Sequence, residues 1–144
     1  MHSVTIENPN LESDGPVIEV NFLISSDLEK KYKEEKKSIP ELVTGKALID
    51  TGATCCMIQE DIPKKLGLTP VGEATVGTAN QKGNKCLVYW MKMVIPSCDV
   101  SYEGAFVAIS LDGQEISCLI GRDFLKISTL TYLGNENKFS FTIS

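Results

Sequence analysis

The sequence predicts an all-β fold with one or two short helices. Apolar and polar residues alternate with a period of two along residues 16–25, 85–95 and 138–144, and turn-forming residues separate these segments. The apolar faces of the three segments consist of Ile18, Val20, Phe22 and Ile24; of Leu87, Tyr89, Met91, Met93 and Ile95; and of Phe139, Phe141 and Ile143. We therefore expect a strand in each segment, and a hairpin in which residues 134–137 join residues 129–133 to the last strand.

Helical signal is scarce. Residues 59–68 contain Asp61 as a possible helix cap and Gly67 as a stop signal, which is enough for one or two turns. Residues 121–128 are a second short candidate. Neither segment is long enough to change the predicted fold class.

A third segment, residues 25–38, is rich in lysine and glutamate. Its apolar residues are only Leu28 and Tyr32, so it offers no apolar stripe that could pack on a core. We expect a charged, solvated excursion between two strands, either irregular or a frayed helix. Glutamates interleave with the lysines and nearly cancel their charge, which argues against nucleic-acid binding by this segment.

The composition is that of a soluble globular protein, with 42% hydrophobic and 23% charged residues. A length of 144 residues suffices for one real core, so we expect a single domain over residues 1–144. The net charge of −5 leaves no broad basic surface, which argues against nucleic acid as the main partner. No apolar run has the length of a membrane span, and the first residues lack a signal peptide's apolar stretch. We therefore expect no membrane association and a cytoplasmic location.

The chain has five cysteines, namely Cys55, Cys56, Cys86, Cys98 and Cys118. Their number is odd and two of them are adjacent, which does not suit a secreted disulfide framework. With His2 as the only histidine and no Cys-x-x-Cys pair, a zinc site is poorly supported. We interpret the cysteines as small buried apolar residues and expect no metal or organic cofactor. A redox or metal-linked protein built on Cys55 and Cys56 is the weaker alternative.

The stretch ALIDTGATCCMI, residues 47–58, places a carboxylate between two segments with the character of buried strands. A charged, unpaired carboxylate is expensive to bury, so Asp50 requires a structural or a chemical reason. One reason would be a β-turn whose backbone donors satisfy the Asp50 side chain, since Asp, Thr and Gly are common turn formers. The other reason is catalysis.

A family resemblance favours catalysis. LIDTGAT, residues 48–54, resembles the active-site loop of the retropepsin-like aspartic proteases. CLIGRDFL, residues 118–125, resembles the family's second motif, in which Gly and then Arg-Asp or Arg-Asn open a short helix. Residues 73–90 form a hairpin candidate where the family has its flap. The resemblance covers roughly residues 17–143 and implies a closed, pepsin-like acid-protease barrel.

The resemblance also implies roles for individual residues. Asp50 would be the catalytic residue, in an active-site loop completed by Thr51, Gly52, Ala53 and Thr54. The substrate-binding flap would consist of Thr78, Ala79, Asn80, Gln81, Lys82 and Gly83, and the structural support of Gly121, Arg122 and Asp123. In retroviral members the matching arginine pairs with an acid at the position of Thr54. Because Thr54 cannot form this ion pair, Asp123 and Asp61 are the alternative partners of Arg122.

The implied function is endopeptidase cleavage of extended polypeptides. Two carboxylates that share one proton activate a water molecule, and this chain has a single Asp-Thr-Gly. The second carboxylate must come from another copy, so we expect a homodimer. The alternative is a non-catalytic dimeric peptide-binding or scaffold module on the same fold, which the intact Asp-Thr-Gly disfavours. Trp90, the only tryptophan, is expected in the core rather than at the substrate.

Overall fold

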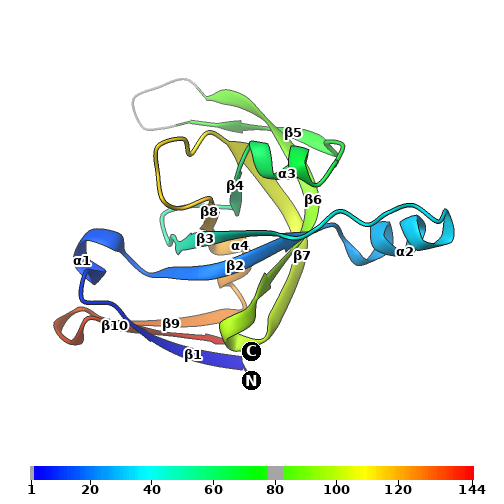
Figure 1. Ribbon diagram of the computed structural model, residues 1–144. Helices are drawn as coiled ribbons and strands as arrows, with labels where there is room; N and C mark the ends of the chain where they lie inside the picture. Colours follow the sequence, from blue (N-terminus) through cyan, green and yellow to red (C-terminus); the bar gives the residue numbers. More distant parts are fainter. Residues whose placement is uncertain (1, 78–82) are drawn as a thin grey trace.

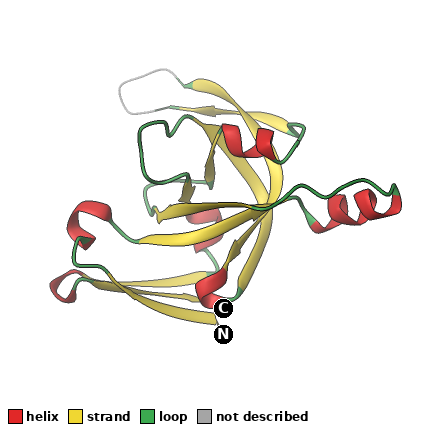
Figure 2. Cartoon of the chain, viewed as in Figure 1, coloured by secondary structure: helices red, strands yellow, loops and turns green. Residues whose placement is uncertain are grey.

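The computed structural model describes residues 2–77 and 83–144 (Figure 1). Strands dominate and the helices are short (Figure 2), so the predicted all-β fold class is confirmed. The described ranges hold four short α-helices rather than one or two, and none of them is long and apolar enough to cross a membrane. The elements are β1 (His2–Glu7), α1 (Leu11–Asp14), β2 (Val17–Leu23), α2 (Ser26–Glu34), β3 (Val43–Ile49), β4 (Met57–Gln59), α3 (Asp61–Lys65), β5 (Gly72–Val76), β6 (Asn84–Ile95), η1 (Pro96–Cys98), β7 (Val100–Ile109), β8 (Cys118–Ile120), α4 (Arg122–Leu125), β9 (Ser128–Leu133), η2 (Gly134–Glu136) and β10 (Lys138–Ile143).

Six strands form a closed barrel. They follow one another in the order β2-β3-β8-β4-β7-β6, and antiparallel pairing of β6 with β2, which sets Met93 opposite Phe22, closes the ring. β5 lies outside the ring and pairs with β6 alone. Side chains that alternate inward fill the barrel, among them Phe22, Met91 and Phe106, all fully buried. The period of two in the sequence therefore marks the core-facing side of β2 and of most of β6.

A second sheet, with the strand order β1-β10-β9, lies beside the barrel next to both chain ends (Figure 1). Phe139, Phe141 and Ile143 of β10 are buried in the same core as the barrel residues. The Phe141 ring stacks on Phe124 of α4, with 6.0 Å between the ring centroids. The predicted hairpin between β9 and β10 is present, with η2 at its turn.

The two faces of β6 have different environments. Tyr89 and Met91 point into the barrel and are buried, whereas Trp90 between them points outward and is 50% exposed. The expectation that Trp90 lies in the core is therefore wrong. Leu87 is 41% exposed, although it shares a face with Tyr89. At this residue β6 has left the barrel and pairs only with β5, so no opposite wall covers the side chain.

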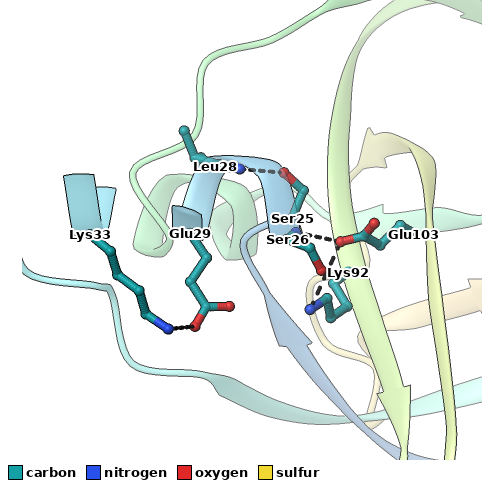
Figure 3. A network of polar contacts seen from close by, with 7 residues as sticks. All are labelled: Ser25, Ser26, Leu28, Glu29, Lys33, Lys92 and Glu103. Carbon is teal, nitrogen blue, oxygen red and sulfur yellow. Dashed lines mark hydrogen bonds and ion pairs between the residues drawn. The ribbon is translucent and has the colours of Figure 1, made fainter. Parts of the chain in front are cut away.

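The charged segment between β2 and β3 contains helix α2, which projects away from the barrel in Figure 1. The Ser25 side chain caps the helix by accepting a hydrogen bond from Leu28 N at 3.2 Å (Figure 3). Glu29 and Lys33 form an ion pair one turn apart at 3.2 Å. Leu28 and Tyr32, four residues apart, are half-buried against the core. The segment is thus a capped helix, in line with the helical alternative, and the expectation that it has no apolar face to pack on the core is wrong.

A carboxylate of the barrel holds the start of α2. Glu103 on β7 accepts a hydrogen bond from Ser26 N, and the Lys92 ammonium on β6 lies 3.9 Å from the same carboxylate oxygen (Figure 3). The hydrogen bond from Ser26 N, with a smaller contribution from Lys92, lowers the pKa of Glu103 below its ordinary value of 4.5. The ionised form of Glu103 is therefore the form that the folded protein prefers.

Replacing Glu103 by Gln should lower the stability of the protein at neutral pH and change it little in acid. A carboxylate with a lowered pKa contributes stability above its unfolded-state value, near 4.5, and this contribution is lost as the pH falls through the folded-state pKa. Chemical unfolding at neutral pH and at a series of pH values below 4.5 measures the gap between wild type and Glu103→Gln. Glu41→Gln, which removes an exposed carboxylate between α2 and β3, is the control. A Glu103→Gln gap that stays constant with pH would contradict this role.

Candidate active site

Asp50 lies where β3 leaves the barrel. β8 is inserted between β3 and β4, parallel to β3 and antiparallel to β4. The connection from β3 to β4, residues 50–56 (the Asp50 loop), must therefore pass the carboxyl end of β8. Asp50 N donates a hydrogen bond to Ile120 O at 2.9 Å, which continues the strand pairing up to the Asp50 residue itself. A buried sheet thus fixes the position of the Asp50 backbone.

A tight turn holds the Asp50 side chain. Gly52 N donates to Asp50 Oδ1 at 2.9 Å, and Ala53 N donates to the Asp50 main-chain oxygen at 3.2 Å. A Cβ atom on residue 52 would lie 3.1 Å from Asp50 Oδ1, so Gly52 leaves the carboxylate room. Asp50 is partly exposed, Thr51 and Gly52 are exposed, and Ala53 is buried. The turn presents a carboxylate at the surface while its base is anchored in the barrel.

The segment after β8 packs directly under the Asp50 loop. A Cβ atom on residue 121 would lie 2.4 Å from the carbonyl carbon and oxygen of Cys55, so the two backbones approach closely only because Gly121 has no side chain. Two main-chain hydrogen bonds follow, from Arg122 N to Ala53 O at 2.9 Å and from Asp123 N to Thr54 O at 3.2 Å. The first residues of α4 therefore clamp the second half of the Asp50 loop.

The Arg122 side chain reaches over the same loop. Its Nη1 donates to Thr51 O at 2.7 Å and its Nη2 donates to Thr54 Oγ1 at 3.3 Å. The expected partners Asp123 and Asp61 are thus wrong: within the described residues, Arg122 is hydrogen-bonded to the loop and makes no ion pair. Thr54, at the position where the resemblance to retroviral members places an acid, contacts Arg122 through a neutral hydroxyl. The main-chain acceptor at Thr51 has no signature in the sequence, because every residue carries a carbonyl oxygen.

The Asp123 side chain turns inward to the loop backbone instead. Its Oδ1 accepts hydrogen bonds from Cys56 N at 3.1 Å, from Phe124 N at 2.8 Å and from the Cys56 thiol at 3.2 Å. Burial, together with the nearby Asp123 charge, raises the pKa of Cys56 and of Cys55. Raised thiol pKa values disfavour the thiolate, which is the form that reacts and binds metals. This is evidence against the redox or metal-linked alternative.

The burial of the five cysteines agrees in part with their interpretation as small buried apolar residues. Cys56, Cys98 and Cys118 are buried, whereas Cys55 and Cys86 are only half-buried. Among the residues that the structure describes, no group of three or more His, Cys, Asp and Glu side chains is arranged to hold a metal ion.

β5 and β6 form the hairpin that the sequence analysis identifies with the flap. Antiparallel pairing extends to Val76 opposite Asn84, and β5 with the first residues of β6 forms an arm beyond the barrel (Figure 1). Of the predicted flap, Thr78, Ala79, Asn80, Gln81 and Lys82 lie outside the described residues. Gly83 is described, and a Cβ atom there would meet the Thr75 side chain at 2.2 Å. The flap role stays a prediction.

The fold and the loop together define a class of protein. A closed barrel, an Asp-Thr-Gly turn at the end of β3 and a Gly-Arg-Asp segment that opens α4 are the features of the retropepsin-like aspartic proteases. The chain belongs to the family described as "gag-polyprotein putative aspartyl protease", whose model matches residues 42–127. The matched range contains both motifs, and the family prediction is confirmed.

The chain is also similar to a solved structure. The crystal structure of a retropepsin-like aspartic protease from Rickettsia conorii covers 98% of this chain and 95% of that chain, with 16% sequence identity and a TM-score of 0.46. No curated protein matches the chain.

Proposed function

We propose that this protein is a homodimeric aspartic endopeptidase in which each subunit contributes Asp50. One observation carries the proposal: the Asp50 carboxylate is partly exposed at the end of a barrel strand, in a turn that Gly121, Arg122 and Asp123 hold from below. The turn by itself supplies the Gly52 N donor that a structural aspartate would need. The second segment, some 70 residues further along the chain, fixes the loop more firmly than such a role requires, which supports catalysis.

The chemistry needs two such carboxylates around one water molecule. The ionised carboxylate takes a proton from the water, the oxygen of the water attacks the scissile carbonyl carbon, and the protonated carboxylate donates its proton to the carbonyl oxygen. The carboxyl group that took the proton from water then donates it to the amine nitrogen as the C–N bond breaks, and one hydroxyl of the tetrahedral intermediate returns its proton to the other carboxylate, which restores the starting pair. Two carboxylates this close cannot both ionise, which provides one acid and one base in the same pH range.

Twofold symmetry would bring the second carboxylate to the site. The chain has one Asp-Thr-Gly, so a closed dimer is the simplest arrangement that sets Asp50 beside its symmetry mate. Thr51 and Gly52 are exposed on the single chain, which leaves the tip of the loop free for such a contact. Under this arrangement the Thr51 hydroxyl would bond to the partner's loop and hold the two aspartates in place.

Incubation of the purified protein with a peptide library, at mildly acidic and at neutral pH, tests the proposal. Mass spectrometry should find internal cuts in extended peptides. The substrate would add strand-like hydrogen bonds to the walls of the site, so folded proteins should be cut less readily than peptides. Binding of peptides without any cut, at every pH tested, would favour the scaffold alternative and overturn the protease assignment.

Activity should also depend on protein concentration. Because each subunit holds half of the site, specific activity should fall on dilution as dimers dissociate, and activity and dimer fraction should share one midpoint. Analytical ultracentrifugation and a peptide-cleavage assay over the same dilution series measure the two quantities. A monomeric species that keeps full specific activity would contradict the two-chain site.

A further inference from the structure

A cavity of about 610 Å³ lies beside Leu48, two residues before Asp50. Leu48 lines it, and Leu48 points outward from β3 because its neighbours Ala47 and Ile49 are buried in the barrel. Since strand pairing continues to Asp50, Leu48 and Asp50 lie on the same face of the chain, about 7 Å apart along the strand. Leu48 therefore connects the cavity to Asp50, the residue to which the proposed function assigns the reaction, although Asp50 itself does not line the cavity.

The floor of the cavity is apolar. Leu48, Val17 from β2 and Ile6 from β1 contribute aliphatic surface, and Ile116, in the segment before β8, also lines the cavity. Each of these side chains is half-buried, so the floor keeps a surface open to the cavity. An aliphatic chain that enters the cavity would bury its surface here.

The rim of the cavity is acidic. Glu7, Asp14, Glu19 and Glu115 line it and are exposed, and Lys46 is the lining residue of opposite charge. Four carboxylates against one ammonium group leave an excess of negative charge at the mouth. Carboxylates on different elements that face one cavity attract a cation into it, and the apolar floor limits the cation to one with a hydrocarbon stem.

The wall that α1 forms is held in place by the fold. Leu11 of α1 is fully buried, and Asn8 Nδ2 donates to Asp14 Oδ2 at 2.9 Å. The chain leaves α1 at Gly15, where φ is +74° and a Cβ atom would lie 2.9 Å from Leu48 Cδ1. The acidic rim at Asp14 is thus fixed against the same Leu48 that forms the floor. Residues 6–19 lie before the range that the family model matches.

We propose that this cavity is a specificity pocket that selects a lysine or arginine side chain of the substrate, close to the scissile bond. The methylene stem of such a side chain would lie on Leu48 and Ile116, and its charged group would reach the carboxylates of the rim, such as Glu19 and Glu115. The inference rests on the proposed protease function, because it treats the cavity as part of a peptide-binding cleft around Asp50.

Peptides that differ at one position test the preference. A cleaved sequence is prepared with lysine, norleucine or glutamate at each position on either side of the cut. At one or more of these positions the lysine peptide should have a kcat/KM about fivefold above that of the norleucine peptide, the size expected of a partly exposed ion pair. The glutamate peptide should be the poorest. Added salt should shrink the lysine preference, because the rim carboxylates are exposed to solvent.

Variants of the rim connect this preference to the cavity. Glu19→Gln combined with Glu115→Gln should reduce the ratio of lysine to norleucine cleavage to near one. Glu115→Lys should shift the preference toward the glutamate peptide. Glu12→Gln is the matched control, since it removes a carboxylate from α1 that does not line the cavity and should leave the ratio unchanged. Circular dichroism checks that each variant is folded.

The outcomes separate this inference from the proposed function. Cleavage with no lysine preference, or a preference that survives the rim variants, overturns the pocket but leaves the protease intact. If a rim variant shifts the midpoint of dimer dissociation but keeps the lysine preference, the cavity is a contact between subunits, and the specificity pocket is overturned. If the wild type cuts no peptide, the protease assignment fails. In that case, calorimetry measures the affinities of the lysine and norleucine peptides for Asp50→Asn, with and without the rim substitutions. A tighter binding of the lysine peptide that the rim substitutions abolish supports the pocket, and equal affinities overturn it.

Discussion

Replacing Asp50 by Asn should reduce peptide cleavage by about 10³-fold or more, since general acid–base catalysis contributes about 10²–10⁴-fold. The amide has nearly the size of the carboxylate and keeps an oxygen that can accept the hydrogen bond from Gly52 N. It cannot take a proton from water. The variant should therefore fold and dimerise, with equal or higher dimer stability, because two carboxyl groups are no longer crowded together. Cleavage rate, melting temperature and dimer midpoint measure these properties separately.

Mixed dimers sharpen the experiment. A dimer with one Asp50 and one Asn at the same position has one carboxylate, and the amide cannot exchange protons with it, so this species should also be strongly impaired. Tandem purification with two different affinity tags isolates it. A structural aspartate predicts the reverse pattern, in which the melting temperature falls and activity falls only in proportion to folded protein. Wild-type turnover by well-folded Asp50→Asn would end the protease assignment.

Gly121→Ala should destabilise the protein and disorganise the Asp50 loop. The added Cβ atom would lie 2.4 Å from main-chain atoms of Cys55, and backbone cannot rotate away as a flexible side chain can. Overpacking of this kind costs about 1–3 kcal/mol, and we expect the upper end of that range. The backbone conformation at Gly121, with φ of −91°, suits any residue, so the whole effect is steric. Chemical unfolding and the cleavage assay should both respond.

Gly72→Ala is the matched control for this experiment. A Cβ atom at Gly72 would meet nothing within 4 Å, so the same chemical change at the start of β5 should leave stability near that of the wild type. If Gly121→Ala were equally harmless, the loop and the start of α4 would not be packed as described, and the clamp on the Asp50 loop would be refuted.

The strand pattern and the Asp-Thr-Gly motif could be predicted because both are local. Inward residues such as Val20 and Met91 alternate with outward residues along their strands, and this alternation holds in any sheet, whatever its partners. Trp90 shows the limit of this reasoning. Its position in the alternation puts it on the outer face, but its size and apolar surface suggest the core, and the pattern was the better guide.

Other features depend on contacts between distant residues and could not be predicted. The partner of Arg122 is a main-chain oxygen and a hydroxyl about 70 residues away, and no residue type marks such an acceptor. The anchor of α2 depends on Glu103, which lies 77 residues after Ser26 in the sequence. The cavity is a further case, since the Asp14 and Glu115 regions meet only in the folded chain.

The insertion of β8 between β3 and β4 has a consequence for the order of folding. The Asp50 loop joins β3 and β4, the strands on either side of β8, but its support arrives only with residues 118–125, so about 70 residues must be synthesised after Asp50 before the loop can close. Contacts of such long sequence separation form slowly, because a large loop must be ordered before they contribute. The Asp50 loop should therefore be among the last parts to become protected from hydrogen exchange during refolding. A nascent chain therefore cannot assemble the support of the Asp50 loop before residues 118–125 have been synthesised.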